Sequence, residues 1–427
     1  MLDSARRIAI AAFGTLGDVF PIVGLAASLA KHCELTVVTS ALYADYFRNA
    51  SCRVVEALSA EAHRAALNGV DLSARDGMPG YLTRYLVASL PTTIAALLEI
   101  DRQKPIDAFL GTGFINGAQW AAEILGKPYI RISLSPWSDK EVMLDEMGSP
   151  NRAAHAVRMC VVRTALRLSA SYHYFTFVNK HLNPIRRQFG LRKYGATDLF
   201  TRPYAALRLA LYPASLLLPT SGHWPPITFT GFPLSDPSDD ELVRRTEQVL
   251  GRCKQRPLVF LTGSGVTDIR PDVHYAYSLC SRLGVTGIFV HSRVGQLGSR
   301  IFPNLALLAF ADLSCLLPRA LLIVHHGGIG TVAQSLRAGI PQLVRPLAFD
   351  QVDNARRIAR LRAGAFLAAE RRHDVEWSAG VVSYLTSNPD ISKATEKHRA
   401  ELAHSNGLGD ASGSILQFLN GSTAHGR

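Results

Sequence analysis

One segment of the chain concentrates residues that can do chemistry. The stretch VHHGGIGTVAQSLRAGIPQLVRPLAFDQVDNARRI (residues 324–358) holds adjacent histidines, three closely spaced glycines and a later Asp-Gln pair. A glycine-rich turn that opens a helix binds phosphates, because its amides are unpaired and the helix dipole favours negative charge. Histidine pairs, in contrast, are common metal ligands. The residue types alone leave both chemistries open.

The spacing within this segment favours the phosphate. Residues 320–324 (ALLIV) predict a buried strand, and a helix is expected to begin at Thr331 and to end at Gly339. Such a strand, turn and helix would direct free amides and His325 at an anion, with His325 as a hydrogen-bond donor or a proton donor to a leaving group. A metal site is less well supported, because adjacent residues in a turn seldom point at one ion and no further ligand follows at helical spacing.

The end of the segment suggests a second contact surface. Asp350 and Gln351 fall in a loop after the next predicted strand, "IPQLVRP". A carboxylate and an amide in such a loop can bracket a polyol by hydrogen bonds. The segment therefore predicts a phosphate site with a polyol site beside it.

The overall composition bounds the kind of protein. A chain of 427 residues exceeds one ordinary core, so two domains are expected. The six cysteines show no CxxC spacing, which argues for a reducing compartment and against a zinc or disulfide framework. No apolar run reaches the length of a membrane span. The net charge of +12 is dispersed without an aromatic and basic module, so nucleic acid is not an expected partner.

Alternating strands and helices must position the chemical segment. "RIAIAAFG" predicts a buried strand, "TLGDVFP" a turn, "IVGLAASLAKH" a helix and "ELTVVTS" the next strand. The pattern restarts after residue 240 with "PLVFLTGSG". We therefore expect an α/β protein of two doubly wound Rossmann-like domains that face each other across a cleft. The expected parts are a first Rossmann-like domain at 1–220, a linker at 221–240, a second Rossmann-like domain at 241–405 and a tail at 406–427 that packs back on the first domain.

From about residue 310 to residue 354 the sequence resembles the nucleotide-sugar signature of family 1 glycosyltransferases, which have the GT-B fold. The His-x-Gly core, "AGIPQLVRP" and the Asp-Gln-x-x-Asn end occur in order. More weakly, "FGTLGDVFPIVGLAASL" and "TGFPLSD" extend the resemblance over the whole chain. The bacterial rhamnolipid branch is the most similar group, followed by the sterol and macrolide branches.

The resemblance implies a role for each matching residue. Asp350 and Gln351 would hold the sugar hydroxyls of the donor. Phe310 would stack on the nucleobase, where plant members carry tryptophan, and Leu313 stands near a position where they carry glutamine. The diphosphate contacts would come from His325, Gly327, Gly328, Ile329, Gly330, Thr331 and, in the "TGSG" turn, Ser264.

The same resemblance implies that Asp18 in "GTLGDVFP" is the catalytic base. An inverting transfer needs a group that removes a proton from the acceptor oxygen as it attacks the anomeric carbon. The alternative for Asp18 is a helix cap. Pro21 favours the first helical position, which would leave Asp18 upstream of the best capping site. A second member of a catalytic dyad is not evident from the sequence.

Acceptor recognition is expected in the N-terminal half. The stretches 63–95, 134–150 and 150–210 are apolar and aromatic, which favours a hydrophobic acceptor such as a lipid or polyketide. The residues between 150 and 210 are also basic and are candidates for contact with a membrane surface or a partner protein. The aromatic candidates are Trp137, Tyr172, Tyr174, Phe175 and Phe177, and core packing explains them equally well.

Together these patterns predict an inverting glycosyltransferase that uses a UDP- or dTDP-sugar, with dTDP-rhamnose as the leading donor. We expect no cofactor and no metal requirement, because no Asp-x-Asp motif occurs and the helix start can neutralise the leaving diphosphate. A glucosyltransferase for a macrolide, sterol or carotenoid-like acceptor is the alternative. A nucleotide-sugar epimerase or a non-catalytic auxiliary subunit is the alternative from another class. The expected location is the cytoplasm, including the inner face of the membrane.

Overall fold

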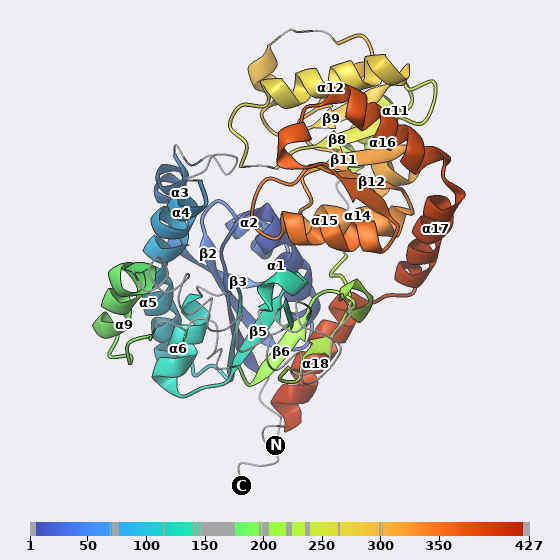
Figure 1. Cartoon of the computed structure of the whole chain (residues 1–427). Coiled ribbons are helices and arrows are strands. Elements are labelled where there is room, and N and C mark those ends of the chain that lie inside the picture. Colours follow the sequence, from blue (N-terminus) through green and yellow to red (C-terminus); the bar gives the residue numbers. More distant parts are fainter. Residues whose placement is uncertain are drawn as a thin grey trace, which may run out of the picture. The chain divides into compact units, whose positions relative to one another are not determined.

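Both halves of the chain fold as parallel sheets flanked by helices, as the alternation of apolar strands and helices predicts (Figure 1). The computed structural model describes residues 6–68, 70, 77–113, 116–139, 142–143, 146, 176–195, 198, 205–218, 224–234, 240–263, 265–298, 300 and 302–421. The chain divides into two units. Unit 1 comprises Met1–Val70, Pro79–Pro233 and Asn406–Arg427, and unit 2 comprises Leu234–Ser405 together with Asp71–Met78. The fold class expected from the sequence is confirmed.

The sheet of unit 1 has seven parallel strands in the order β3-β2-β1-β4-β5-β6-β7. The chain reverses its direction of travel across the sheet between β1 and β4, so the ends of these two strands form the switch point at which such sheets bind ligands. The strands are β1 (Arg7–Ala12), β2 (Glu34–Ser40), β3 (Arg53–Leu58), β4 (Ala108–Thr112), β5 (Tyr129–Ser133), β6 (Leu207–Ala210) and β7 (Thr228–Phe229).

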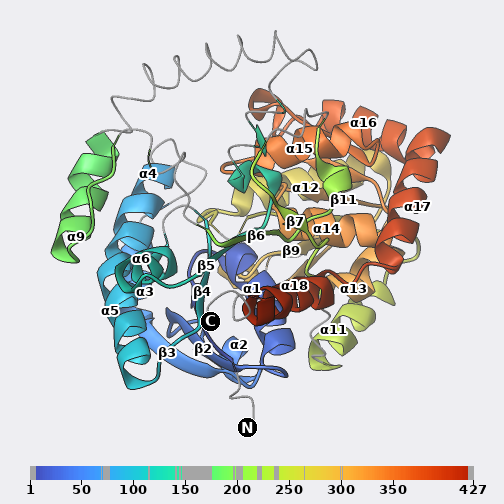
Figure 2. The same cartoon turned by 90° about the horizontal axis from the view of Figure 1, so that it is seen from below.

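Helices cover both faces of this sheet. The apolar side chains of α5 and α6 form one core cluster with β1 and β4, while α1 and α18 lie on the other side of the strands (Figures 1 and 2). Figure 2 shows α18 beside α1, where the hydroxyls of Ser28 and Ser412 are 2.7 Å apart. The helices are α1 (Leu16–Leu29), α2 (Ala44–Arg48), α3 (Ala60–Leu67), α4 (Gly77–Tyr81), α5 (Ala88–Gln103), α6 (Gly117–Leu125), α9 (Asn183–Gln188) and α18 (Gly407–Gly421), with π-helical turns at Leu82–Val87 and Val178–Leu182.

The sheet of unit 2 has six parallel strands in the order β10-β9-β8-β11-β12-β13. This is the doubly wound order, with its switch point between β8 and β11. The strands are β8 (Leu258–Leu261), β9 (Gly287–Val290), β10 (Leu305–Leu308), β11 (Leu322–His325), β12 (Gln342–Val344) and β13 (Gly364–Phe366).

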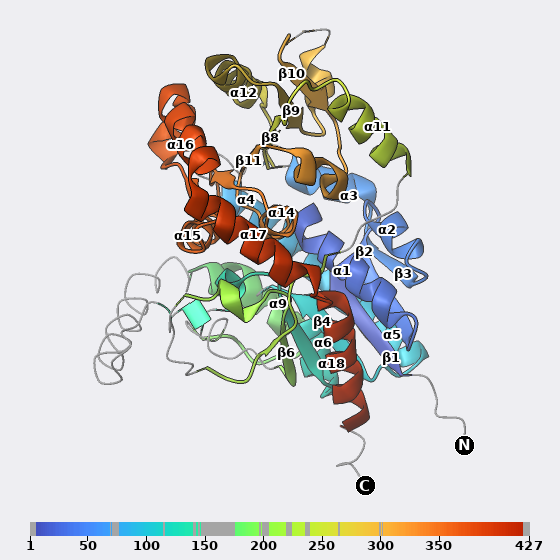
Figure 3. The same cartoon turned by 90° about the vertical axis from the view of Figure 1, so that its right-hand side faces the viewer.

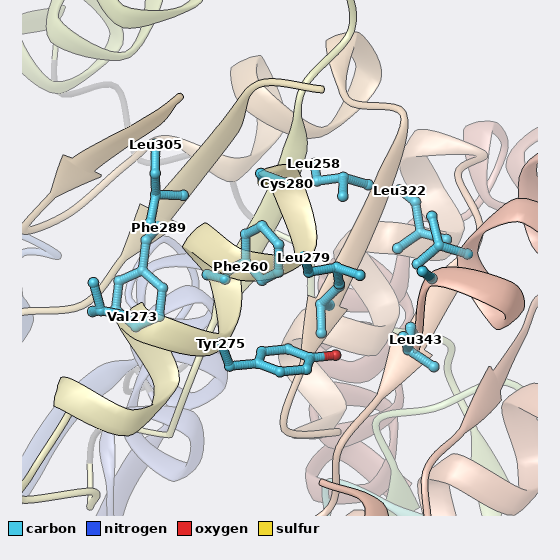
Figure 4. Packing of buried hydrophobic residues seen from close by; sticks show 14 of the residues in the cluster. Leu258, Phe260, Val273, Tyr275, Leu279, Cys280, Phe289, Leu305, Leu322 and Leu343 are labelled. Atoms are coloured by element: carbon cyan, nitrogen blue, oxygen red, sulfur yellow. The ribbon is translucent and has the colours of Figure 1, made fainter. Parts of the chain in front are cut away.

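Unit 2 also carries helices on both faces. Figure 3 shows α12 and α16 on one side of β8, β9 and β11, and α11 on the other. Figure 4 shows the core beneath α12, where Phe260 and Leu279 lie on one side of Tyr275 and Phe289 lies beside Val273. The helices are α11 (Asp240–Leu250), α12 (Arg270–Leu283), α13 (Leu313–Leu316), α14 (Ile329–Ala338), α15 (Gln351–Arg360), α16 (Val375–Ser387) and α17 (Pro389–Ala403).

Three expected boundaries differ from the structure. Helix α1 begins at Leu16, within the segment expected to be a turn, and helix α14 begins at Ile329, two residues before Thr331. The expected linker 221–240 contributes β7 to the sheet of unit 1, and the units divide between Pro233 and Leu234. Short strands with few residues, such as β7, give too little periodicity for detection in a sequence.

Within the part of the chain that the structure describes, no helix is both long enough and apolar enough to cross a membrane.

Candidate functional site

The two glycine-containing turns of unit 2 meet at its switch point. A Cβ atom on Gly263, after β8, would lie 3.7 Å from the ring of His326, after β11. A Cβ atom on Gly328 would lie 2.7 Å from Nε2 of the same ring, so a larger side chain at Gly328 would require the ring to move, whereas the contact at Gly263 is an ordinary van der Waals distance. The histidine and glycine turn therefore lies where this fold class binds its ligands. Ser264, the expected phosphate contact of the first turn, lies outside the described residues.

The start of α14 is open to an anion. Gly328 is the N-cap, it supplies no side-chain cap, and the first turn contains no acidic residue. The amides of Ile329, Gly330 and Thr331 occupy the first three helical positions, which have no partner within the helix. Side-chain caps occupy the corresponding position at the starts of α13, α16 and α17. The unpaired amides of α14 thus form a site suited to a phosphate.

Both ring nitrogens of His325 make hydrogen bonds within the protein. It is 1% exposed, its Nε2 atom lies 3.0 Å from Oε1 of Gln342, and its Nδ1 atom accepts a hydrogen bond of 3.1 Å from the Gly327 amide. Burial lowers its pKa to about 3, with a smaller contribution from His326, so the ring is neutral at physiological pH. The expected direct contact of His325 with a diphosphate, or its use as a proton donor, does not fit this geometry, because both ring nitrogens are occupied. The metal alternative fails at His325 for the same reason.

His326 takes the more exposed position of the pair. Burial lowers its pKa to about 4, and a hydrogen bond with the backbone of Leu261 opposes part of this change. A small cavity lies beside both histidines and is also lined by Thr262, Arg345 and Arg372. The polar edge of the turn therefore carries a neutral imidazole and two guanidinium groups.

The loop after β12 is joined to this turn. Nδ2 of Asn354 donates to the carbonyl of Gly327 and to Oδ2 of Asp350, at 2.9 Å each. Oε1 of Gln351 accepts from the amides of Leu347 and Ala348. The structure thus brings the expected phosphate turn and the expected sugar loop together, while the carbonyl of Gln351 is used to hold the loop itself.

Gly327 is the position where the two segments touch, so it offers a test of their packing. Its φ is +94°, and an added Cβ would lie 2.7 Å from Cγ1 of Val344 and 3.1 Å from the Gln351 carbonyl oxygen. We expect Gly327→Ala to reduce the free energy of unfolding by about 1–3 kcal/mol. Gly330→Ala is the matched control, because no atom lies within 4 Å of its added Cβ. Urea unfolding of both variants checks this, and equal midpoints would contradict it.

The expected nucleobase contacts lie on different kinds of surface. Phe310, beyond the end of β10, is 59% exposed, so it is not a core residue and is free to stack on a planar ligand. Leu313 begins α13 and packs partly against the core cluster of α11 and β9. Its side chain serves the core at least in part, which leaves Phe310 as the stronger candidate.

In unit 1, Asp18 is the third residue of α1 and forms a capping box with Thr15. Its Oδ2 atom accepts from the Thr15 amide at 2.7 Å and from the Thr15 hydroxyl at 2.9 Å. The expectation that Asp18 lies upstream of the helix is therefore wrong, because Pro21 is accommodated inside α1. Burial raises the pKa of Asp18, and the two hydrogen bonds from Thr15 oppose this increase only in part. Oδ1 is left to accept a proton.

Buried aromatic residues surround the turn that precedes Asp18. The Tyr43 hydroxyl donates to the Gly14 carbonyl at 3.0 Å, and the Tyr85 hydroxyl lies 3.4 Å from both the amide and the carbonyl of Gly14. A Cβ on Gly14 would lie 2.5 Å from Oδ2 of Asp18, so the carboxylate is packed directly against this turn. His63 contacts both tyrosines, edge-on to Tyr43 and tilted against Tyr85, with ring centroids 5.3 and 4.6 Å away. Asp18 is half-buried beside these residues, and the partial removal of water from its carboxyl group is the first cause of its raised pKa.

The structure describes only two of the aromatic residues expected to bind the acceptor, Trp137 and Phe177. Phe177 packs partly buried against the core cluster of α5 and α6, and Trp137 is half-buried after β5. Tyr172, Tyr174 and Phe175, like most of the basic 150–210 region, lie outside the described residues. The structure assigns a core role to Phe177.

Sequence reasoning did not identify the residues that support these turns. Asp272 in α12 contacts Arg345, Arg372 and His373, three residues that follow more than 70 positions later in the chain. Gln342 carried one signal, a polar residue inside an otherwise apolar predicted strand. Asn354 carried another, as the last residue of the Asp-Gln-x-x-Asn pattern.

Comparisons with known proteins agree with this geometry. The family described as Erythromycin biosynthesis protein CIII-like, C-terminal domain, matches residues 287–406. The elloramycin glycosyltransferase of Streptomyces olivaceus is 35% identical over 103 residues, which are 24% of this chain and 25% of the relative. A sterol 3-beta-glucosyltransferase of Cryptococcus neoformans is 33% identical over 100 residues, 23% of this chain and 6% of the relative. The matched segments thus span a quarter or less of these two relatives.

Solved structures are similar over nearly the whole chain. The glycotransferase of kitacinnamycin superposes with a TM-score of 0.70 at 20% identity and covers 97% of this chain and 99% of its own. The spinosyn rhamnosyltransferase complexed with thymidine diphosphate superposes with a TM-score of 0.62 at 16% identity, covering 96% and 100%. At these identities the likeness establishes the fold. Residues 287–406 are thus similar to the C-terminal domain of that glycosyltransferase family, and the whole chain has the fold of these glycosyltransferase structures, the GT-B architecture.

Proposed function

We propose that the protein transfers a sugar from a nucleoside-diphosphate sugar to a hydroxyl group of a hydrophobic natural product or lipid. The observation that carries the proposal is the uncapped start of α14 at a switch point, joined through Asn354 to the Asp350–Gln351 loop. The helix start would hold the diphosphate, the loop would hold the sugar hydroxyls, and Phe310 would stack on the base.

The proposed reaction inverts the configuration at the anomeric carbon. The bond from the anomeric carbon to the diphosphate oxygen breaks as the acceptor oxygen forms a new bond on the opposite face. Oδ1 of Asp18 takes the proton of the acceptor hydroxyl, and the amides at the start of α14 stabilise the charge that develops on the leaving diphosphate. We propose that no metal is needed for this step, because the sequence lacks an Asp-x-Asp motif and the helix start supplies positive potential.

The proposed donor is a dTDP-sugar, with dTDP-rhamnose first and UDP-glucose as the alternative. Support for a dTDP-sugar comes from the spinosyn rhamnosyltransferase, whose structure was solved with thymidine diphosphate. Support for glucose comes from the sterol 3-beta-glucosyltransferases among the relatives. An Asp-Gln pair can serve either sugar.

A donor screen tests the proposal. A ligand that binds only the folded protein increases the free energy of unfolding, by about 2.7 kcal/mol when its concentration is 100 times its Kd. The melting temperature rises accordingly. We expect a shift with dTDP or dTDP-rhamnose that exceeds the shift with UDP-glucose, and no shift with dTMP. If no UDP- or dTDP-sugar raises the melting temperature, the proposed function is wrong.

A further inference from the structure

We infer that Gln342, His325 and Asn354 form a frame around Gly327 that positions the diphosphate turn and the sugar loop as one unit. The inference rests on the proposed function and assigns these three side chains as positioning residues. In this arrangement His325 has no direct contact with the donor. It orients the backbone of the turn, and the donor binds to that backbone.

The amide, the carbonyl and the Cα of Gly327 all have close partners. Its amide donates to Nδ1 of His325, and its carbonyl accepts from Nδ2 of Asn354. Its Cα faces Val344 and Gln351 closely enough to exclude a Cβ. Because both backbone polar atoms of Gly327 are used internally, the direction in which the following amides of α14 point is set by these partners.

Asn354 connects the two ligand-facing segments. The residue is 1% exposed, and the two hydrogens of its Nδ2 group match its two acceptors, the Gly327 carbonyl and the Asp350 carboxylate. Gly327 lies directly before the start of α14, and Asp350 is the expected sugar ligand. A displacement of either acceptor therefore changes the hydrogen bond to the other.

Gln342 sets the state of the histidine. With Nδ1 of His325 accepting from an amide, the proton resides on Nε2 and is donated to Oε1 of Gln342. Gln342 is fully buried, and its Nε2 atom has no partner within the described residues. An unpaired buried amide lowers stability, and an apolar side chain would avoid this. The hydrogen bond to His325 explains the glutamine. It holds the proton of the ring on Nε2, so that Nδ1 can accept from the Gly327 amide.

If Asn354 holds both segments, its substitution should weaken the binding of the diphosphate and of the sugar together. We expect Asn354→Ala to weaken binding of dTDP and UDP about three- to tenfold. We also expect it to change the ratio of Kd values for a nucleotide sugar and its nucleoside diphosphate by at least threefold. Asp350→Asn retains an acceptor for Asn354, so it should change this ratio while leaving the Kd of the nucleoside diphosphate within twofold of wild type. Isothermal calorimetry with dTDP, dTDP-rhamnose, UDP and UDP-glucose gives both quantities.

Two further variants separate positioning from a general loss of stability. Thr395→Val removes a buried hydroxyl in α17 of the same unit, where it bonds to the Ser392 carbonyl, and should leave both quantities unchanged. Asn354→Ser replaces the amide by a shorter side chain with a single O–H donor, so at most one of the two acceptors can be satisfied. It should show a defect in both quantities, and it provides the test if the alanine variant does not fold.

The outcomes distinguish the inference from the proposed function. If wild type binds none of the four ligands, the proposed function fails and the inference fails with it. If wild type binds them and the Asn354 variants match it, the inference alone is overturned. The inference is also overturned if Thr395→Val reproduces the Asn354 defect, since the effect is then one of stability.

Discussion

Asp18→Asn is expected to lower the rate of sugar transfer about 10²- to 10⁴-fold, the range that a positioned general base contributes. The asparagine side chain can still accept the Thr15 amide through its carbonyl oxygen, so the capping interaction at the start of α1 is retained. Donor binding involves the residues of unit 2 in the proposal, and its Kd should remain close to that of wild type. Single-turnover kinetics and calorimetry on the same preparation measure the two quantities.

The geometry also predicts the pH profile of the wild-type rate. Burial raises the pKa of Asp18 above the ordinary aspartate value of 3.8. A base must be deprotonated to act, so the acidic limb of kcat/KM should fall at a higher pH than an exposed aspartate would give. Such a raised pKa also means that the folded state disfavours the carboxylate, so this group stabilises the fold most at low pH and the contribution is lost as pH rises through its folded pKa. Asp18→Asn should remove the acidic limb.

Asp45→Asn is the matched control in unit 1. Asp45 also lies in the first turn of a helix, α2, but it is exposed and pairs with Arg48 on the surface. Its substitution should leave transfer unchanged. Near-normal transfer by Asp18→Asn, with intact donor binding, would show that another group is the base.

The sequence was sufficient to predict the two parallel sheets, because their strands are buried on both faces and read as continuous apolar runs. The end of α14 at a left-handed glycine was predicted equally well. Gly339 adopts a φ value of +68° directly after this helix. These features are local, and each depends on only a few neighbouring residues.

Helix starts were predicted less well, because two local signals competed. Pro21 suggested a helix that begins there, while Thr15 and Asp18 have the spacing of a capping box. The capping box prevailed in the structure because the helix can pass Pro21 at the loss of one early hydrogen bond. A cap and a catalytic base were treated as alternatives for Asp18. In the structure both hydrogen bonds of the cap go to Oδ2, so a cap and the proposed base are compatible in one carboxylate.

The roles of the histidines required contacts between distant parts of the chain. Gln342 lies 17 residues after His325, on the neighbouring strand, and nothing local shows which ring nitrogen it will meet. The order of the motif thus predicted the turn that lies at the switch point of unit 2, whereas the partner of the His325 ring could only come from the packing of β11 against β12.

Asp272→Asn is expected to reduce the free energy of unfolding by about 3–5 kcal/mol, because it leaves buried guanidinium charge without its partner. Asp272 is 2% exposed. It accepts hydrogen bonds from Arg345 at 2.9 Å and from Arg372 at 3.3 and 3.4 Å. The Arg345 guanidinium also lies 3.9 Å from the ring centroid of Tyr275, so it cannot turn to solvent without breaking the core. The backbone amide of Arg345 donates a hydrogen bond to the His325 carbonyl. The loss of stability around Arg345 should therefore extend to the histidine turn.

The pH dependence of stability follows from the same cluster. Burial alone would raise the pKa of Asp272, but the hydrogen bond with His373 and the charges of Arg345 and Arg372 together outweigh burial and lower it to about 2 from an ordinary 3.8. A depressed pKa contributes stability that is present above pH 4 and is lost as pH falls towards 2, in an amount of about 2 kcal/mol. Chemical denaturation between pH 2 and 6 should show this loss in wild type and not in Asp272→Asn.

Asp268 provides the comparison that separates a low pKa from a structural role. Its pKa is also about 2, owing first to the side-chain hydrogen bond from Arg270, but the pair is exposed on the surface. Exposed pairs are screened by water and contribute little to stability. We therefore expect Asp268→Asn to change the melting temperature far less than Asp272→Asn. Equal effects would mean that burial of the Arg345 and Arg372 charges does not govern the stability of unit 2, and that the ion pairs of Asp272 act as surface pairs do.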